Sequence, residues 1–167
     1  DPHNLAMALR VGLEAPMQLC AAFLGATEAW PMPRKIVNIS SGLGRRAMAS
    51  QSGYCAAKAG MDHFTRCLAL EEALKPHGAK VTSLAPGVID TDMQIQLRSA
   101  PADSFPDQSG FQQLKATGQL TSPADAAKRF KLAASCGFAP SAAARRYAPA
   151  CSDICRCTGA VVWFWAC

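Results

Sequence analysis

The first 132 positions alternate between helical and strand-like spacings of apolar residues. Between positions 4 and 27, apolar residues recur at every third or fourth place, which predicts one helix. Pro16 falls inside this pattern and should remove a backbone hydrogen bond or bend the helix, because proline has no N–H. Short apolar runs at 36–39 and 80–84 predict strands. Strands separated by long helical segments are typical of an α/β fold with a parallel sheet.

A second helical pattern lies between the two predicted strands, from 52 to about 74. Ser52 is a suitable N-terminal cap, and Pro76 and Gly78 end the pattern. Small residues between 56 and 60 leave room for a neighbouring element to approach this helix closely. The predicted core-facing stripe consists of Ala57, Met61, Phe64, Leu68 and Leu74.

The segment after the second strand is helical but interrupted. Positions 92–120 contain two prolines and two glycines, so we expect a partly mobile helical region of the kind that forms a lid. The next helix begins with a cap serine, Ser122, then proline at the first helical position and Asp125 in the first turn. This helix should extend at least to Leu132.

Candidate chemistry is concentrated between the first predicted strand and the second helix. Ser41 follows the strand, Tyr54 lies thirteen residues later, and Lys58 is four residues beyond Tyr54. Residues four apart on a helix share a face, so the phenol and the ammonium can meet. Ser41 can then hydrogen-bond a carbonyl oxygen that the phenol protonates. A Tyr-x-x-x-Lys pair is weak by itself, because a packed tyrosine beside a solvated lysine gives the same pattern.

An ammonium group beside the phenol would change its acidity. A free tyrosine has a pKa near ~10, which is too high for efficient proton transfer at neutral pH. A positive charge about 4 Å away, at an effective dielectric near 20, favours the phenolate by roughly 4 kcal/mol. That energy corresponds to roughly three pKa units before screening and moves the phenol towards the working pH.

Three motifs occur in order: NISSGLG at 38–44, YCAAKAG at 54–60 and VTSLAPGVIDTDM at 81–93. Together they resemble the catalytic half of the short-chain dehydrogenase/reductase family, and the resemblance extends over roughly 4–130. It assigns the catalytic serine to Ser41 and the general acid to Tyr54. It assigns to Lys58 the lysine that also holds the nicotinamide ribose.

The same resemblance implies a nicotinamide site after the second strand. Pro86 and Gly87 match the turn beside the nicotinamide, and Ile89 matches the backbone contact to its carboxamide. Thr91 matches the hydroxyl nearby. No metal site is implied. The implied cofactor-binding set is Tyr54, Lys58, Pro86, Gly87, Ile89 and Thr91.

The run from 91 to 127 is further similar to the branch that contains sepiapterin reductases and bacterial benzil reductases, which reduce a carbonyl next to another carbonyl. The resemblance therefore implies NADP as the cofactor, with NAD as the alternative, and hydride transfer from its reduced form to a dicarbonyl or a pterin side-chain ketone. The expected partners are a small-molecule carbonyl substrate and further copies of this chain, because the helix that carries Tyr54 lies in a subunit interface in the family.

The family resemblance implies part of a doubly wound, Rossmann-like parallel sheet from which the N-terminal βαβ units are absent. Family members open with a strand and a glycine-rich turn that cradles the pyrophosphate. No Gly-x-x-x-Gly-x-Gly lies near a first strand here, so we expect a C-terminal fragment in which residues 1–132 are the catalytic portion. Gly12 also stands where the family has a proton-relaying asparagine. The competing hypothesis is a non-catalytic piece that retains the oligomerising helices and half of the active site.

Charge and composition argue against a nucleic-acid-binding protein and against a membrane protein. The net charge of +5 is not concentrated in the dense basic stripe of a nucleic-acid binder. There is no run of about 18 apolar residues and no signal-like start, so we expect no membrane partner and a cytoplasmic location. Arg45 and Arg46 favour solvated surface over a contact with an anionic substrate.

Residues 133–167 differ in character from the rest of the chain and are rich in cysteine. The spacing of Cys151, Cys155 and Cys157 is not that of a common zinc site. A divergent, poorly ordered tail is therefore favoured over a metal-binding module. The apolar run at 159–164 could still add a strand at a sheet edge.

Overall fold

A computed structural model describes residues 1–135 and 160–164 of the 167-residue chain. Three parallel strands, in the order β2-β1-β3, form its sheet. The strands are β1 (Arg34–Ile39), β2 (Lys80–Leu84) and β3 (Ala160–Phe164). The α-helices are α1 (Pro2–Leu9), α2 (Ala15–Ala26), α3 (Ser52–Ala73), α4 (Asp92–Ser99), α5 (Gln108–Ala116) and α6 (Pro123–Ser135). A π-helical turn, η1 (Arg10–Glu14), and a 3-10 turn, η2 (Gly42–Gly44), complete the described elements.

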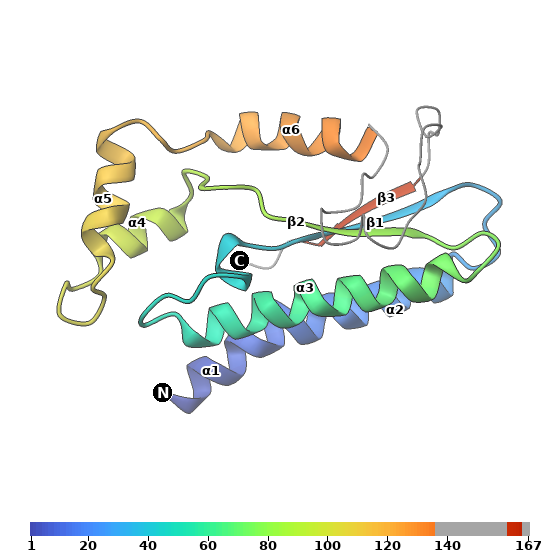
Figure 1. The fold of residues 1–167 in the computed structure, drawn as a ribbon, viewed down its shortest axis with the longest axis horizontal. Helices are drawn as coiled ribbons and strands as arrows, with labels where there is room; N and C mark the ends of the chain where they lie inside the picture. The colour runs from blue at the N-terminus through green and yellow to red at the C-terminus, as the bar shows by residue number, and fades with distance from the viewer. Residues whose placement is uncertain (136–159, 165–167) are drawn as a thin grey trace.

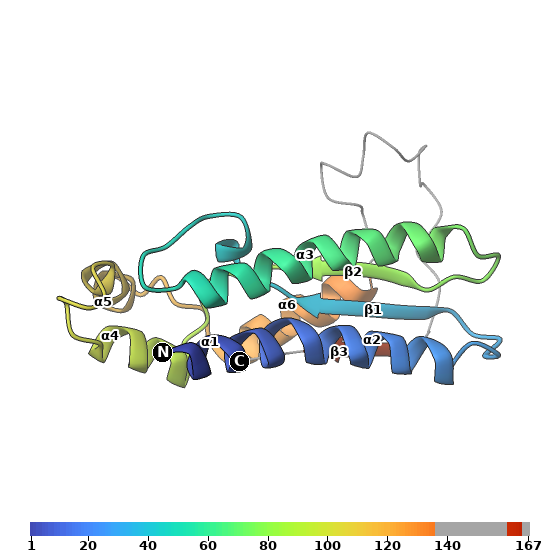
Figure 2. The ribbon, with the colours of Figure 1, turned by 90° about the horizontal axis from the view of Figure 1, so that it is seen from below.

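Helices lie on both sides of the sheet. Helices α2 and α3 lie on one side of it and α6 lies on the other (Figures 1 and 2). Helix α3 connects β1 to its parallel neighbour β2, with Ile36 opposite Val81. This arrangement confirms the expected α/β class and the partial Rossmann-like sheet.

The first helical stretch contains a π turn near its middle. The N–H of Ala15 donates to the carbonyl of Arg10, five residues earlier rather than four. Pro16 has no N–H for the carbonyl of Gly12, so the regular ladder is interrupted where the π turn lies. The proline therefore removes a regular bond, as predicted, and the helix continues to Ala26.

Glycines allow this first stretch to lie very close to α3. A Cβ placed on Gly12 would lie 2.9 Å from the Cβ of Ala57. A Cβ on Gly60 would lie 3.0 Å from a methyl carbon of Leu13. Carbon contacts this short are strongly repulsive, so a larger residue at Gly12 would force the helices apart, whereas one at Gly60 would require the Leu13 side chain to shift. The small residues of α3 do admit a close neighbour, which is the chain's own first helical stretch.

The core between the sheet and these helices is apolar with one buried polar chain. The Asn38 amide nitrogen donates to the Thr65 hydroxyl at 2.8 Å, and that hydroxyl donates to the Met61 carbonyl at 2.7 Å. The Cys20 thiol donates to the Asn38 amide oxygen at 3.6 Å. These bonds satisfy buried polar groups and connect β1 to both α2 and α3. The surrounding apolar residues are Ile36, Leu68, Phe23, Leu24, Phe64 and Val81.

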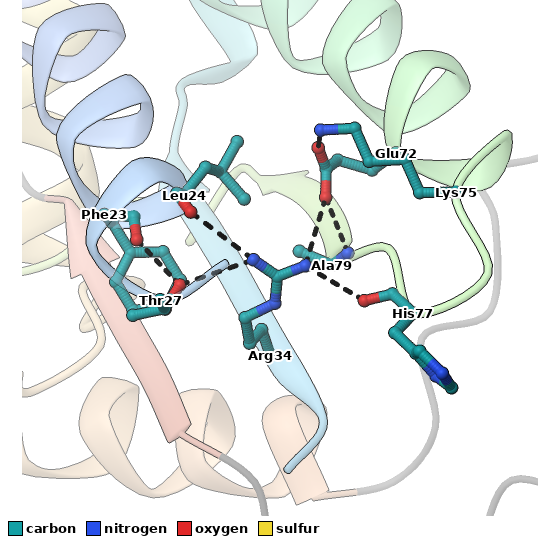
Figure 3. Close-up of polar contacts among 8 residues, drawn as sticks. All are labelled: Phe23, Leu24, Thr27, Arg34, Glu72, Lys75, His77 and Ala79. Atoms are coloured by element: carbon teal, nitrogen blue, oxygen red, sulfur yellow. Dashed lines mark hydrogen bonds and ion pairs between the residues drawn. The ribbon is translucent and has the colours of Figure 1, made fainter. Parts of the chain in front are cut away.

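A buried ion pair connects the start of β1 to the end of α3 (Figure 3). The Arg34 guanidinium lies 3.8 Å from the Glu72 carboxylate and donates to the carbonyl of His77 at 2.9 Å. Glu72 also accepts hydrogen bonds from the Lys75 ammonium at 2.5 Å and from the Ala79 N–H at 2.8 Å. Through Arg34, the start of β1 therefore binds both the end of α3 and the turn between α3 and β2.

Two details predicted for α3 are wrong. Ser52 is the first helical residue, and Gln51 occupies the cap position without a side-chain hydrogen bond. The reason is that the chain turns at Ser50, which has a φ of 61°, before the helix begins. Leu74 is 87% exposed, because the helix ends at Ala73 and Leu74 lies beyond the buried stripe.

The C-terminal part partly follows the sequence prediction. The Ser122 hydroxyl accepts a hydrogen bond from the Asp125 N–H at 3.1 Å and caps α6, as predicted. Helix α6 extends to Ser135, past the expected start of the tail at 133. β3 pairs with β1 at an edge of the sheet, which confirms the strand predicted near 159–164. Cys151, Cys155 and Cys157, where a metal-binding module was the disfavoured alternative, lie outside the described residues, and the boundary at 132 stays a prediction.

One described helical stretch bears on the expectation of no membrane partner. The stretch Pro2–Ala26 is long and apolar enough by length and composition, with a mean hydropathy of 1.2 over an 18-residue window. Core helices of soluble proteins and N-terminal signal sequences meet the same criterion. In this fold, the stretch packs along α3 through Gly12 and Leu13.

Candidate functional site

Lys58 is almost completely buried, with 2% of its surface exposed. Its ammonium donates to the carbonyl of Ile39, the last residue of β1, at 3.0 Å. The same nitrogen lies 5.6 Å from the centre of the Tyr54 ring. A buried cation needs compensating contacts, and a carbonyl oxygen and an aromatic face supply them. The structure thus brings together Tyr54 and Lys58, one helical turn apart on α3, at the end of β1.

Ser41 lies where β1 gives way to η2. Its hydroxyl oxygen accepts a hydrogen bond from the Leu43 N–H at 3.2 Å and caps η2. Because this bond uses an acceptor lone pair, the hydroxyl hydrogen remains able to donate. Ser41 is two residues beyond Ile39, whose carbonyl receives the Lys58 ammonium. The strand end and the lysine therefore occupy the same region of the molecule.

The 3-10 turn η2 lies directly on α3. A Cβ placed on Gly44 would lie 3.0 Å from a carboxylate oxygen of Asp62 and 3.1 Å from the backbone carbonyl of Lys58. The other carboxylate oxygen of Asp62 is buried and has no hydrogen-bond partner among the described residues. A larger residue at 44 would push η2, and with it Ser41, away from Lys58. Sequence reasoning did not single out this contact, although the two glycines after Ser41 are its available signal.

The predicted nicotinamide residues follow β2 at the same end of the sheet. The Ser40 N–H donates to the carbonyl of Leu84 at 2.9 Å, so the two segments stay paired as far as Ser40, the residue before Ser41. Gly87 has a φ of 82°, a conformation that favours glycine, and a Cβ there would contact nothing within 4 Å. Thr91 is the N-cap residue of α4, and its side chain makes no capping hydrogen bond.

A short bridge to the segment before α6 orients Ile89. The carbonyl of Val88 accepts from the N–H of Thr121, and the N–H of Asp90 donates to the carbonyl of Thr121, both at 2.9 Å. In a parallel bridge, the residue between these two bonds directs its own N–H and C=O the other way. The backbone groups of Ile89 therefore face away from Thr121.

Gly12 occupies the position at which the resemblance places a proton-relaying asparagine. It is buried in η1 against Ala57. A side chain here would overlap Ala57, so asparagine does not fit unless the helices move apart. An open groove of about 300 Å3 also runs along this stretch, away from the predicted site residues. The residues that line it are Leu9, Arg10, Leu13, Glu14, Met17 and Gln18.

Known proteins share both the motifs and the fold of this chain. The family profile described as "short chain dehydrogenase" matches residues 4–102, which is more than half of the chain. The chain belongs to the short-chain dehydrogenase family.

Individual relatives support the branch as well as the family. A benzil reductase ((S)-benzoin forming) from Bacillus cereus is 38% identical over 123 residues, which are 74% of this chain and 49% of the relative. A sepiapterin reductase from Xenopus tropicalis is 33% identical over 104 residues, which are 62% of this chain and 38% of the relative. The resemblance read from the three motifs is therefore confirmed.

A solved structure confirms the fold of this short-chain dehydrogenase chain. The crystal structure of the KRED1-Pglu enzyme matches it with a TM-score of 0.56 and 31% sequence identity. The match covers 64% of this chain and 43% of that structure. The chain spans about half, or less, of the length of each of these relatives.

Proposed function

We propose that this chain takes part in the reduction of a small carbonyl compound to an alcohol, with Tyr54 as the proton donor. The observation that carries the proposal is the position of the Lys58 ammonium. It is 3.0 Å from the carbonyl oxygen of Ile39 and 5.6 Å from the Tyr54 ring centre. One buried cation thereby connects the strand that leads to Ser41 with the helix that carries the phenol.

Each of the three side chains has a distinct role in this proposal. Tyr54 transfers its phenolic proton to the carbonyl oxygen of the substrate as the carbonyl carbon is reduced, and solvent returns the proton afterwards. The Lys58 ammonium stabilises the negative charge left on the phenolate. The Ser41 hydroxyl donates to the same substrate oxygen and orients it towards Tyr54.

The residues at the end of β2 fit the nicotinamide end of a cofactor. The carboxamide would meet the N–H and C=O groups of Ile89, which face away from the Thr121 bridge. Gly87 leaves open space beside the backbone, and Pro86 and Thr91 border the same turn. Lys58 and Tyr54 would face the ribose hydroxyls. When bound, NADP in its reduced form, or NAD as the alternative, supplies the hydride.

The proposed substrate class is a carbonyl adjacent to a second carbonyl. Its support is the similarity to a benzil reductase and a sepiapterin reductase, whose names state their substrates. A homo-oligomer and a cytoplasmic location are proposed on the same family grounds. A specific observation also favours a second candidate, a non-catalytic piece, because Gly12, packed against Ala57, stands where the resemblance places a proton-relaying asparagine.

Calorimetric titration separates the two candidates. The purified chain is titrated with NADPH and with NADH, and NADPH consumption is then followed with benzil as the substrate. Binding in the micromolar range together with benzil reduction supports the reductase. No heat of binding at millimolar cofactor rejects the reductase for this chain and supports the non-catalytic piece.

A further inference from the structure

One hydrogen bond joins the loop before α3 to the connection between α4 and α5. The Ser50 hydroxyl donates to the backbone carbonyl of Ser104 at 2.6 Å. The two residues are 54 positions apart in the sequence. In both ribbon views, the loop before α3 lies beside the α4–α5 connection (Figures 1 and 2). The contact therefore links two segments that belong to different βα units.

Ser50 has an unusual backbone conformation. It is the one non-glycine residue with a positive φ, 61°, in the part of the chain that the structure describes. Such a conformation is unfavourable for a residue with a Cβ and persists where surrounding contacts hold it. Ser50 stands immediately before the cap residue of α3 and four residues before Tyr54. The turn at Ser50 thus sets the direction in which Tyr54 enters the helix.

Helices α4 and α5 form one unit on the other side of this contact. The backbone carbonyl of Arg98 accepts hydrogen bonds from the side chains of Gln108 at 3.1 Å and Gln112 at 3.3 Å. Phe105, which is 3% exposed, packs against Phe111 with ring centres 5.5 Å apart. Because these contacts are internal to the unit, α4 and α5 should move together when the connection at Ser104 moves.

The base of this unit is held by charge. Asp90, just before α4, contacts Lys115 at 2.5 Å and Arg98 at 3.8 Å. These ion pairs lie beside Thr91, where α4 begins, whereas the contact at Ser104 lies at the far end of the unit. The unit is thus fixed by ion pairs at its base. At its tip, the hydrogen bond from Ser50 to Ser104 joins it to the loop before α3.

We propose that Ser50 is the catch of a lid formed by residues 92–116. Its hydroxyl holds the lid against the loop that carries Ser41 and leads to Tyr54, and loss of this bond opens the approach to both residues. The lid and its catch are inferred from the hydrogen bond between Ser50 and Ser104 and from the contacts within 92–116. Their effect on substrate binding rests on the proposed function.

The acceptor in this bond is a backbone carbonyl, which provides matched variants. Ser50→Ala removes the donor and keeps a Cβ at the positive φ. Ser50→Gly removes the donor and relieves the backbone strain. Ser104→Ala keeps the acceptor carbonyl and the bonds from the N–H groups of Ser104 and Phe105 to the Pro101 carbonyl, but it loses the bond from the Ser104 hydroxyl to that carbonyl at 3.0 Å. Ser104→Ala is therefore the control.

Hydrogen–deuterium exchange of the 167-residue chain, read by mass spectrometry, tests the catch without any cofactor. Both Ser50 variants should raise exchange in peptides from 92–116 by roughly three- to tenfold, the loss expected for one hydrogen bond. Peptides from 57–70 of α3 should exchange as in the wild type, and Ser104→Ala, which keeps the bond from Ser50, should raise exchange of 92–116 less than either Ser50 variant. Unchanged exchange of 92–116 in Ser50→Gly would overturn the catch, as would faster exchange in Ser50→Ala alone, which would assign the effect to backbone strain.

A kinetic measurement distinguishes failure of the catch from failure of the proposed function. With benzil and saturating NADPH, Ser50→Ala should raise KM several-fold, while the Kd for NADPH stays the same. An unchanged KM in a chain that reduces benzil would overturn the role of the lid in substrate access. A wild-type chain that binds no NADPH counts against the proposed function, and the exchange measurement then decides the catch by itself.

Discussion

Glu72→Gln should destabilise the chain strongly, although Glu72 is one of two adjacent glutamates on the same helix. The Glu72 side chain is 1% exposed, and it receives hydrogen bonds from Lys75 and Ala79 beside the Arg34 guanidinium (Figure 3). Arg34 is itself 6% exposed. Glutamine keeps the shape of the side chain but removes the charge. The buried guanidinium of Arg34 then loses its counter-charge, and the ion pair between the start of β1 and the end of α3 is lost.

The expected loss can be bounded from these contacts. Removing one partner of a buried ion pair typically costs about 3–5 kcal/mol. Arg34 keeps its hydrogen bond to the His77 carbonyl, and a glutamine oxygen can still accept from Ala79. Each retained hydrogen bond contributes roughly 1 kcal/mol, so we expect a loss of about 1–3 kcal/mol for Glu72→Gln.

The effect should depend on pH in a defined direction. Burial by itself raises the pKa of Glu72, but the hydrogen bonds from Lys75 and Ala79 and the charges of Lys75 and Arg34 lower it below its ordinary value. A carboxyl whose pKa is lower in the folded state stabilises the fold fully above its unfolded pKa, about 4.3, and loses that contribution as the pH falls through the folded value. The difference between wild type and variant should be constant from about pH 8 to pH 5 and shrink below about pH 4.

Urea unfolding followed by far-UV circular dichroism measures this difference. Glu71→Gln is the matched control, because it removes the same charge from the neighbouring, exposed side chain. That control should change the free energy of unfolding by no more than about 0.5 kcal/mol. Equal losses for the two variants would refute the view that the buried pair holds this end of the fold together.

Two further predictions concern the site and the core. Gly44→Ala should displace η2 from Lys58 and Asp62 and lower benzil turnover by about tenfold or more, whereas Gly42→Ala, whose Cβ meets nothing within 4 Å, should leave the rate of NADPH consumption unchanged. Equal rates for the two would contradict the close contact at Gly44. Burial raises the pKa of the Cys20 thiol, and the hydrogen bond with Asn38 only partly opposes this. At about pH 8, iodoacetamide should therefore modify the exposed Cys67 and spare Cys20 until the chain unfolds. Peptide mapping that finds both cysteines modified at one rate would contradict the burial of Cys20.

Much of the fold was predictable because local signals agreed with the final packing. The cap at Ser122 and the proline at 123 begin α6, and the two apolar runs form β1 and β2. Leu74 deviates because helical periodicity does not indicate at which residue the buried stripe stops. Ser52 deviates because the chain turns at Ser50, whose positive φ no local sequence pattern predicts for a serine.

The candidate site was only partly predictable for a related reason. The i, i+4 spacing places Tyr54 and Lys58 on one face of a helix in any setting. The bond from Lys58 to the Ile39 carbonyl depends on how α3 crosses β1, which the close approach at Gly44 permits. The pairing of β3 with β1 could not be predicted either, because an apolar run indicates a strand but not which strand it pairs with.

The central claim is that the phenol of Tyr54, held beside the buried Lys58 ammonium, donates the proton in carbonyl reduction. Its most direct test is NADPH-dependent benzil reduction by Tyr54→Phe, with Tyr147→Phe, a change at the chain's other tyrosine, as the control. Tyr54→Phe should lower kcat by roughly 10²- to 10⁴-fold with an unchanged unfolding midpoint and little change in the Kd for NADPH, while Tyr147→Phe stays at the wild-type rate. Turnover by Tyr54→Phe within a few-fold of the wild type would contradict the claim.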